Sequence, residues 1–347
     1  MKKKKKIILL ITMLIFVLLL FIISLFIGSS KMTLLEQIKA IFGIGENNHI
    51  VIMQKIRVPR SIAAIVVGAS LGLAGLMMQT SLGNDMASPQ TLGVTNAATF
   101  GANVAIIGFA GGFLATGNNI ANYFASSNIF STSLIAFVFA FFSILLILGL
   151  CKLTSVSKET IILAGVAITA IWTGLTSLLQ YYATDVSLSA AVVWSFGDLG
   201  RANYNIDFLI LVILILSSSF FFLYSNKYNA MLAGDDVAKT VGIKVESLRL
   251  ITLLISSLIT AICVANLGII AFLGIICPHI AKRIFGQDHK HSIPATILIG
   301  SILLLFSDTL ARLIGGGSSL PVGIITSIIG APFFLYIIFR RKKAQNQ

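Results

Sequence analysis

The chain has 347 residues, of which 57% are hydrophobic and 11% are charged. A soluble globular domain carries about 25% charged residues, so this chain has too little polar surface to cover itself in water. Its mean hydropathy of +0.98 excludes a cytosolic enzyme and predicts a protein embedded in a lipid bilayer. The net charge of +13 is therefore interpreted by its position relative to the membrane, and not as a surface for nucleic acid.

The N-terminus carries five lysines, Lys2 to Lys6, followed by an unbroken apolar run from Ile7 to Gly28. Such a segment is either a secretory signal peptide or a first membrane span. As a helix the run reaches about 33 Å, longer than a signal core, and it ends without a clear A-x-A cleavage site. We therefore expect a first span.

Nine further apolar stretches follow, each long enough to indicate a membrane span. They lie near residues 61–82, 93–110, 131–151, 160–180, 206–225, 248–268, 269–285, 293–313 and 320–339. Ten spans place both termini on the same side of the membrane. With both termini in the cytoplasm, the cytoplasmic segments hold 18 of the 25 Lys and Arg residues, as the positive-inside rule requires.

Several spans carry small residues at about every fourth position, for example Ala64, Gly68, Gly72 and Gly75. Lipid tails provide no hydrophobic drive for helix association, so such stripes allow helix backbones to approach closely. The stripes predict a compact all-helical bundle.

Basic residues at Lys55, Arg57 and Arg60 run against the positive-inside rule, because this topology places them on the outer side. Two readings remain open. The side chains could meet an acidic partner on the outer face, or they could extend to the lipid headgroups.

The longest polar cytoplasmic insert, residues 226–247, contains a segment typical of a short helix. Asp235 or Asp236 is expected to cap its start, Val237 and Val241 fall on one face, and Gly242 suits a left-handed stop. The segment is either a lever for a soluble partner or an ordinary solvated loop.

The sequence lacks the motifs of several enzyme classes. There is no phosphate-binding G-x-x-x-x-G-K-[ST], no H-E-x-x-H and no G-x-S-x-G, so the chain is not expected to hydrolyse nucleotide itself. The cysteines, Cys151, Cys263 and Cys277, occur singly, which argues against a disulfide framework or a metal site.

Few ionisable residues are expected inside the spans, which disfavours an ion-coupled secondary carrier. Asp308 and Arg312 are four residues apart on one helix and are expected to pair with each other. Trp172 and Trp194 are expected in an interfacial aromatic belt.

Taken in order, several motifs resemble one family, the FecCD permeases of binding-protein-dependent ABC importers for iron siderophores, haem and vitamin B12. The matching segments cover about 280 residues and have these sequences: Arg57-Val58-Pro59-Arg60, Gly68-Ala69-Ser70-Leu71-Gly72-Leu73-Ala74-Gly75 with Gln79, Leu92-Gly93-Val94, Leu163-Ala164-Gly165-Val166-Ala167, Gly234 to Gly242, Pro278-His279, Asp288-His289, Leu320-Pro321-Val322-Gly323 and Gly330-Ala331-Pro332-Phe333-Phe334.

The resemblance implies a type II ABC importer permease fold, in which residues 1–347 form one transmembrane domain of about ten helices in the bacterial cytoplasmic membrane. It also implies a second permease subunit, either a copy of this chain or a related one. Two ATP-binding subunits, which hold ATP and Mg, and an extracytoplasmic substrate-binding protein complete the assembly. The chain itself is then neither an enzyme nor a cofactor-binding protein.

The same resemblance implies roles for three sets of residues. The coupling helix that contacts the ATPase corresponds to Gly234, Asp235, Asp236, Val237, Ala238 and Gly242. The outer arginines that receive carboxylates of the binding protein correspond to Arg57, Arg60 and Arg312. The cytoplasmic gate before the fifth span corresponds to Ser157, Lys158 and Glu159.

The sequence departs from the family pattern in two places. Asn84-Asp85 stands where the family usually has Asn-Pro. The family pattern Gly-Pro-x-Gly-Phe-x-Gly is replaced by Gly268-Ile269-Ile270-Ala271-Phe272-Leu273-Gly274. The resemblance implies an iron(III) siderophore as cargo, because siderophores are the family's most frequent cargo, with haem and cobalamin as alternatives. Selection in this family lies mainly in the binding protein.

Overall fold

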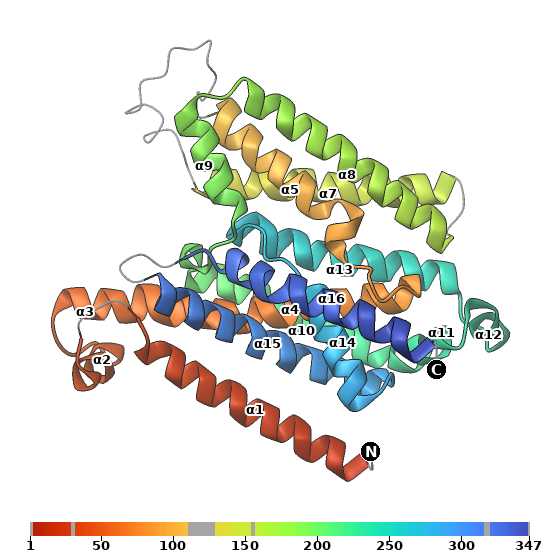
Figure 1. Cartoon of the computed structure of the whole chain (residues 1–347), viewed down its shortest axis with the longest axis horizontal. Helices are drawn as coiled ribbons and strands as arrows, with labels where there is room; N and C mark the ends of the chain where they lie inside the picture. The colour runs from red at the N-terminus through yellow and green to blue at the C-terminus, as the bar shows by residue number, and fades with distance from the viewer. Residues whose placement is uncertain (1–2, 29–31, 110–128, 154–156, 316–319, 346–347) are drawn as a thin grey trace. The chain divides into compact units, whose positions relative to one another are not determined.

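The computed structural model describes residues 3–28, 32–109, 129–153, 157–315 and 320–345 (Figure 1). Lys2 of the basic N-terminus and the last residue of the predicted span 93–110 lie outside these ranges. The regular elements of the described residues are all helices. They are α1 (Lys3–Phe26), α2 (Leu34–Ile41), α3 (Asn47–Val51), η1 (Ile52–Arg57), α4 (Val58–Leu82), η2 (Pro89–Leu92), α5 (Val94–Asn103), η3 (Val104–Phe109), α7 (Ile129–Leu153), α8 (Lys158–Tyr181), α9 (Asp185–Ser195), η5 (Leu199–Arg201), α10 (Tyr204–Leu223), α11 (Ser225–Leu232), α12 (Asp235–Thr240), α13 (Val245–Leu267), α14 (Leu273–Phe285), α15 (His289–Ile314) and α16 (Val322–Gln345).

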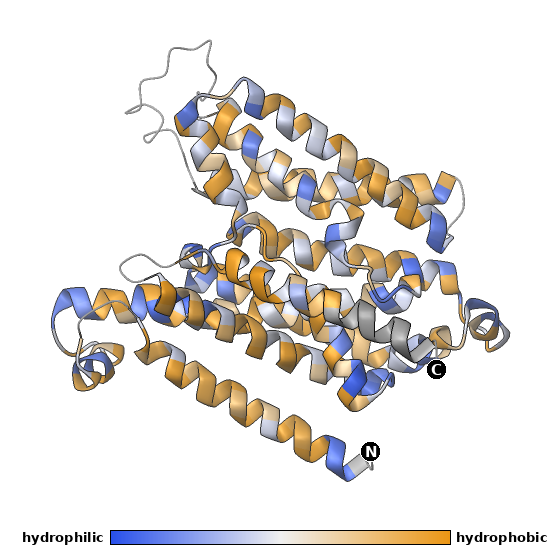
Figure 2. Cartoon of the chain, in the orientation of Figure 1, coloured by the Kyte–Doolittle hydropathy of each residue, from blue (hydrophilic) through white to orange (hydrophobic). Residues whose placement is uncertain are grey.

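Each of the ten predicted spans contains a helix, so the predicted all-helical membrane bundle is confirmed. Within the described residues, seven helical stretches are long and apolar enough to cross a bilayer. The stretch formed by α5 and η3 is shorter, and the 13 residues of α14 extend about 20 Å. Figure 2 shows apolar residues along most of α1, with polar residues at its N-terminal end.

The described chain forms two compact units, each of which combines distant parts of the sequence. Unit 1 comprises Met1–Leu76, Asp198–Ser225 and Ile270–Gln347, and unit 2 comprises Met77–Gly197 and Asn226–Ile269. The boundary falls within α4. The expectation of a single functional domain over residues 1–347 stays a prediction.

In unit 1, α15 is the common neighbour of α1, α10, α14 and α16. The predicted close approach of glycines is confirmed there. A side chain at Gly68 would collide with the backbone of Gly300 in α15, and one at Gly75 would collide with Gly274 in α14. These contacts bring helix backbones together without any need for bulky side chains to interlock.

In unit 2, α5 lies against α7, α8 and α13, and α7 also contacts α13. Trp172 of α8 is 5% exposed, and its indole N–H donates to the Ser143 hydroxyl at 3.0 Å. Trp194 is 6% exposed and belongs to the same unit's core. The expected aromatic belt is therefore wrong for both tryptophans, since each indole ring fills space between helices.

Candidate functional site

The predicted coupling segment is a helix, α12, as expected. Its N-cap is Gly234, which has φ 116°, a conformation that side chains other than glycine rarely adopt. Asp235 is the first helical residue, so the expectation that Asp235 or Asp236 caps the helix is wrong. The physical reason is that the Asp235 carboxylate is held by basic side chains of other helices, described below.

The end of α12 has the left-handed stop that the sequence predicts. Gly242 has φ 81°, and its N–H donates to the Lys239 carbonyl at 3.0 Å. The next N–H, of Ile243, reaches back to the Ala238 carbonyl at 3.1 Å. This pair of hydrogen bonds is a Schellman motif, which terminates the helix after two turns.

The two faces of α12 differ in character. Ala238 is fully buried, whereas Val237 and the adjacent Val241 are 50% and 65% exposed. Asp236 is exposed beside them. The segment thus presents two apolar side chains and a carboxylate to its surroundings, as a surface for another polypeptide would.

Asp235 lies on the inner side of α12 and joins it to two other helices of unit 2. One carboxylate oxygen accepts from Arg249 Nη2 of α13 at 2.6 Å, and the other lies 3.1 Å from Lys158 Nζ of α8. Burial raises the pKa of Asp235, but hydrogen bonds from Arg249 and Lys158 outweigh it and hold the pKa below its usual range. The carboxylate therefore stays ionised at neutral pH.

Arg249 extends the same network to a fourth helix. Its side chain is 3% exposed, and its Nε donates to the Ser81 carbonyl at the end of α4 at 2.9 Å. The sequence gives no sign of this role, because Arg249 lies at the start of the predicted span 248–268, 14 residues from Asp235 and 168 from Ser81. The structure thus brings together Lys158 of the predicted gate and Asp235 of the predicted coupling helix.

The other two predicted gate residues lie at the start of α8. The Ser157 hydroxyl accepts the Thr160 N–H at 3.1 Å and so caps the helix. Glu159 is exposed in the first turn, where a negative charge is favourable beside the helix dipole. Both positions are accounted for by the helix start, and the gate role of Ser157, Lys158 and Glu159 stays a prediction.

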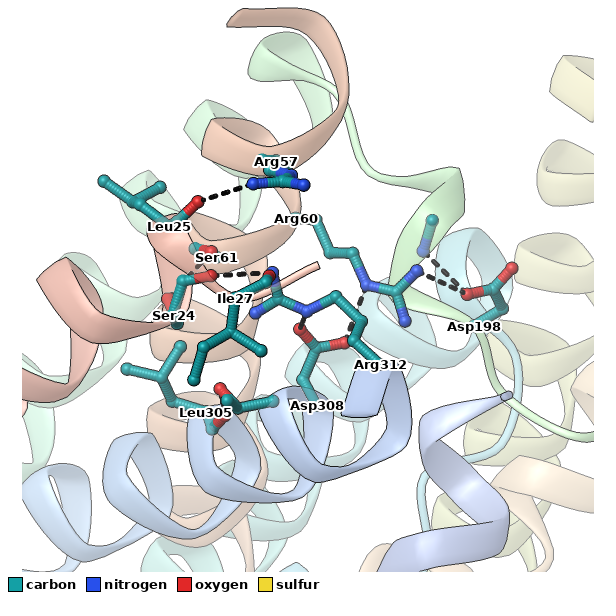
Figure 3. A network of polar contacts seen from close by, with 12 residues as sticks. Ser24, Leu25, Ile27, Arg57, Arg60, Ser61, Asp198, Leu305, Asp308 and Arg312 are labelled. Atoms are coloured by element: carbon teal, nitrogen blue, oxygen red, sulfur yellow. Dashed lines mark hydrogen bonds and ion pairs between the residues drawn. The ribbon is translucent and has the colours of Figure 1, made fainter. Parts of the chain in front are cut away.

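A second group of charged residues, the outer arginine cluster, lies in unit 1 and comprises Arg57, Arg60, Asp198, Asp308 and Arg312 (Figure 3). Asp308 is fully buried and accepts from Arg60 Nε at 2.7 Å. Its other oxygen lies 3.0 Å from Arg312 Nε, which confirms the predicted pair within α15. Asp198 lies 3.7 Å from Arg60 Nη1.

Two further nitrogen atoms of this cluster donate to the end of α1. Arg57 Nη1 donates to the Leu25 carbonyl at 3.1 Å, and Arg312 Nη1 donates to the carbonyls of Ser24 and Ile27 at 2.7 and 3.0 Å (Figure 3). The last carbonyls of a helix lack partners within it and are costly to leave unpaired in a membrane. The two arginines therefore anchor α1.

Arg57, Arg60 and Arg312 are 5%, 4% and 7% exposed. Neither Arg57 nor Arg60 extends to the headgroup region as a surface side chain, whereas Lys55 of the same sequence cluster is exposed. The docking role of the three arginines stays a prediction, and the structure assigns them internal contacts that the sequence did not reveal.

Among the described residues, no group of three or more His, Cys, Asp and Glu side chains is placed to hold a metal ion. Cys151, Cys263 and Cys277 are each buried as free thiols.

Comparison with known proteins places these features in a family. Residues 15–340 match the FecCD transport family. An ABC transporter permease protein of Methanocaldococcus jannaschii is 42% identical over 342 residues, which cover 98% of this chain and 96% of that protein. The iron(3+)-hydroxamate import system permease protein FhuG of Bacillus subtilis is 35% identical, over 92% of each chain.

A solved structure of a metal-chelate type ABC transporter in an inward-facing conformation superposes with a TM-score of 0.80 at 27% identity, covering 96% of this chain and 99% of that one. Other relatives are named for the import of hemin, molybdate and cobalamin. The chain belongs to the FecCD transport family and is the multi-pass membrane permease of an ABC importer, which works with an ATPase and a binding protein as its partners.

Proposed function

We propose that this permease passes an iron(III) siderophore across the cytoplasmic membrane, with both of its termini on the cytoplasmic side. The observation that carries the proposal is the extent of similarity to the relative named for iron(3+)-hydroxamate import, over 92% of both chains. Haem and cobalamin are the alternative cargoes, because relatives named for their import are 31% and 32% identical to this chain.

In the proposed mechanism, the energy comes from ATP bound by a separate subunit that contacts α12. Val237 and Val241 are exposed on this short helix, and Asp235 connects it to α8 and α13. Closure of the ATPase would displace α12, and the displacement would reach the predicted gate at Ser157, Lys158 and Glu159. A second permease subunit, identical or related, would complete the passage.

The binding protein is proposed to dock at the outer arginine cluster. The cluster contains three guanidinium groups and two carboxylates, and Arg312 Nη2 is buried without a hydrogen-bond partner among the described residues. A carboxylate from a docked partner would supply the missing acceptor and charge. Arginine suits such a contact because its planar guanidinium binds a carboxylate through two hydrogen bonds.

The cargo is tested by measuring uptake of radiolabelled ferric siderophore, haem and cobalamin in parallel. Cells that lack this gene are compared with the same cells carrying the intact gene. We expect siderophore uptake to be lost and then restored, with haem and cobalamin uptake unchanged. If haem or cobalamin uptake is lost instead, that compound is the cargo and the siderophore is not. Unchanged uptake of all three compounds would reject the proposal.

A further inference from the structure

Four helices of unit 2 meet at a small group of polar atoms, which we call the Asp235 clasp: the side chains of Asp235, Lys158 and Arg249 and the carbonyl of Ser81. They come from α12, α8, α13 and the last turn of α4. The sequence separates Ser81 from Arg249 by 168 residues, so the tertiary fold creates the group.

The C-terminal end of α4 favours the positive charges of Lys158 and Arg249 beside it. Gly83 terminates α4 with φ 59°, and a Cβ there would lie 3.2 Å from Lys158 Nζ. Arg249 donates to the carbonyl of Ser81, two residues before Gly83. The negative end of the helix dipole therefore attracts both cations, and Asp235 bridges them.

The clasp is stronger than an ordinary surface ion pair. Its bonds are charge-assisted and short, and the Arg249 side chain is only 3% exposed. Separating Asp235 from it would remove the carboxylate that lies 2.6 Å from a buried guanidinium, which is strongly unfavourable. By contrast, the pair of Lys239 and Glu246 in the same insert is 3.9 Å apart with side chains 54% and 62% exposed, and such pairs contribute little.

We propose that Asp235 is a positioning residue that transmits movement of α12 to the ends of α4, α8 and α13 through this clasp. The inference rests on the permease role and is independent of which cargo is carried. When a partner pulls on α12, the Asp235 carboxylate draws Lys158 and the first turn of α8 with it. Without the carboxylate, α12 can move while α8 stays in place.

The variant Asp235→Asn tests this proposal in the complete importer reconstituted in liposomes. Two ratios are measured: the stimulation of ATP hydrolysis by the binding protein, and the ferric siderophore taken up per ATP hydrolysed. We expect both ratios to fall about tenfold, as loss of a coupling contact of this kind implies. Asp235→Glu is expected to restore much of the coupling, because it keeps the charge.

Glu246→Gln is the matched control, since it removes an acidic partner from the exposed pair in the same insert. It should leave both ratios within about twofold of the wild type. If Asp235→Asn also stays within that range, the proposal is overturned. The proposal is also overturned if Asp235→Glu lowers both ratios as much as Asp235→Asn does. An equal loss in Glu246→Gln overturns it as well, because Asp235 then has only a structural role.

Lys158→Gln provides a second variant in case Asp235→Asn fails to assemble. The side chains of Lys158 and Asp235 are 30% and 28% exposed, so removing Lys158 does not leave a fully buried charge without its partner. The proposal requires the same loss of coupling here, and normal coupling by Lys158→Gln overturns it. In the double variant the losses should not multiply, because both changes break one contact.

The two readouts separate this inference from the cargo proposal. Stimulation of hydrolysis needs no cargo, so it tests the clasp even if the wild-type importer takes up no ferric siderophore. A wild-type importer that takes up no ferric siderophore would reject the cargo proposal but not the proposed role of Asp235.

Discussion

Asp308 shows how one residue can organise a membrane-embedded charge cluster. It is fully buried and contacts the guanidinium groups of Arg60 and Arg312, and Arg312 also donates to carbonyls at the end of α1. Of the ionisable residues inside the predicted spans, Asp207, Arg249, Asp308 and Arg312 are buried. The described part of the chain buries Arg57, Arg60, Asp207, Arg249, His289, Asp308 and Arg312.

Replacing Asp308 by Asn should destabilise the fold by about 3–5 kcal/mol, because both arginines lose the charge that compensates them. The free energy of unfolding in detergent micelles measures the effect. Asp198→Asn is the control, since this carboxylate is 34% exposed and 3.7 Å from Arg60, and its loss should cost less than about 1 kcal/mol. Equal losses for the two variants would contradict the assigned role of Asp308.

At the scale of elements, small residues set how closely helices pack. Gly68 of α4 meets Gly300 of α15 backbone to backbone, whereas Gly149 of α7 has open space where a side chain would extend. In the sequence, only Gly68 has small residues four positions away on both sides, and the structure shows that α15 is the helix it meets. Their different surroundings decide which of them tolerates a larger residue.

The variant Gly68→Ala should destabilise unit 1 by about 1–3 kcal/mol, because α15 must shift to admit the methyl group. Gly149→Ala should be neutral or slightly stabilising, since alanine favours a helix by up to about 1 kcal/mol over glycine. Thermal unfolding of the two purified variants provides the comparison. A stability of Gly68→Ala equal to the wild type would show that the close approach is dispensable.

At the scale of the whole molecule, the chain must connect a binding protein with an ATPase. The proposed contacts are the outer arginine cluster in unit 1 and α12 in unit 2. Burial of the arginines means that a docked carboxylate would join groups that already hold α1 and α15. Docking and internal anchoring would then share the same side chains.

The docking proposal is tested with Arg57→Gln in nanodiscs. Glutamine keeps a polar amide but lacks the charge, so we expect affinity for the binding protein to fall about tenfold at low salt. The salt dependence of binding should also weaken. Lys39→Gln, which removes an exposed cation from α2 outside the cluster, is the control. Equal affinities of wild type and Arg57→Gln at low salt would refute docking at this cluster.

The sequence by itself determined the membrane location, the all-helical bundle, the family and the short helix α12. These features depend on local hydropathy, on glycines at fixed spacing and on the order of motifs, all of which can be identified in the linear sequence. The left-handed stop at Gly242 belongs to the same class, because a single residue type satisfies it.

Only the tertiary structure decided which charges are buried and which partners they meet. Asp235, Lys158, Arg249 and Ser81 come from four helices, and nothing in their sequence neighbourhoods specifies the pairing. Trp172 was misplaced for the same reason, since its exposure depends on α5 and α7 beside it. An electrostatic or packing contact is a property of atoms close in space, and distant segments reach that proximity through the fold alone.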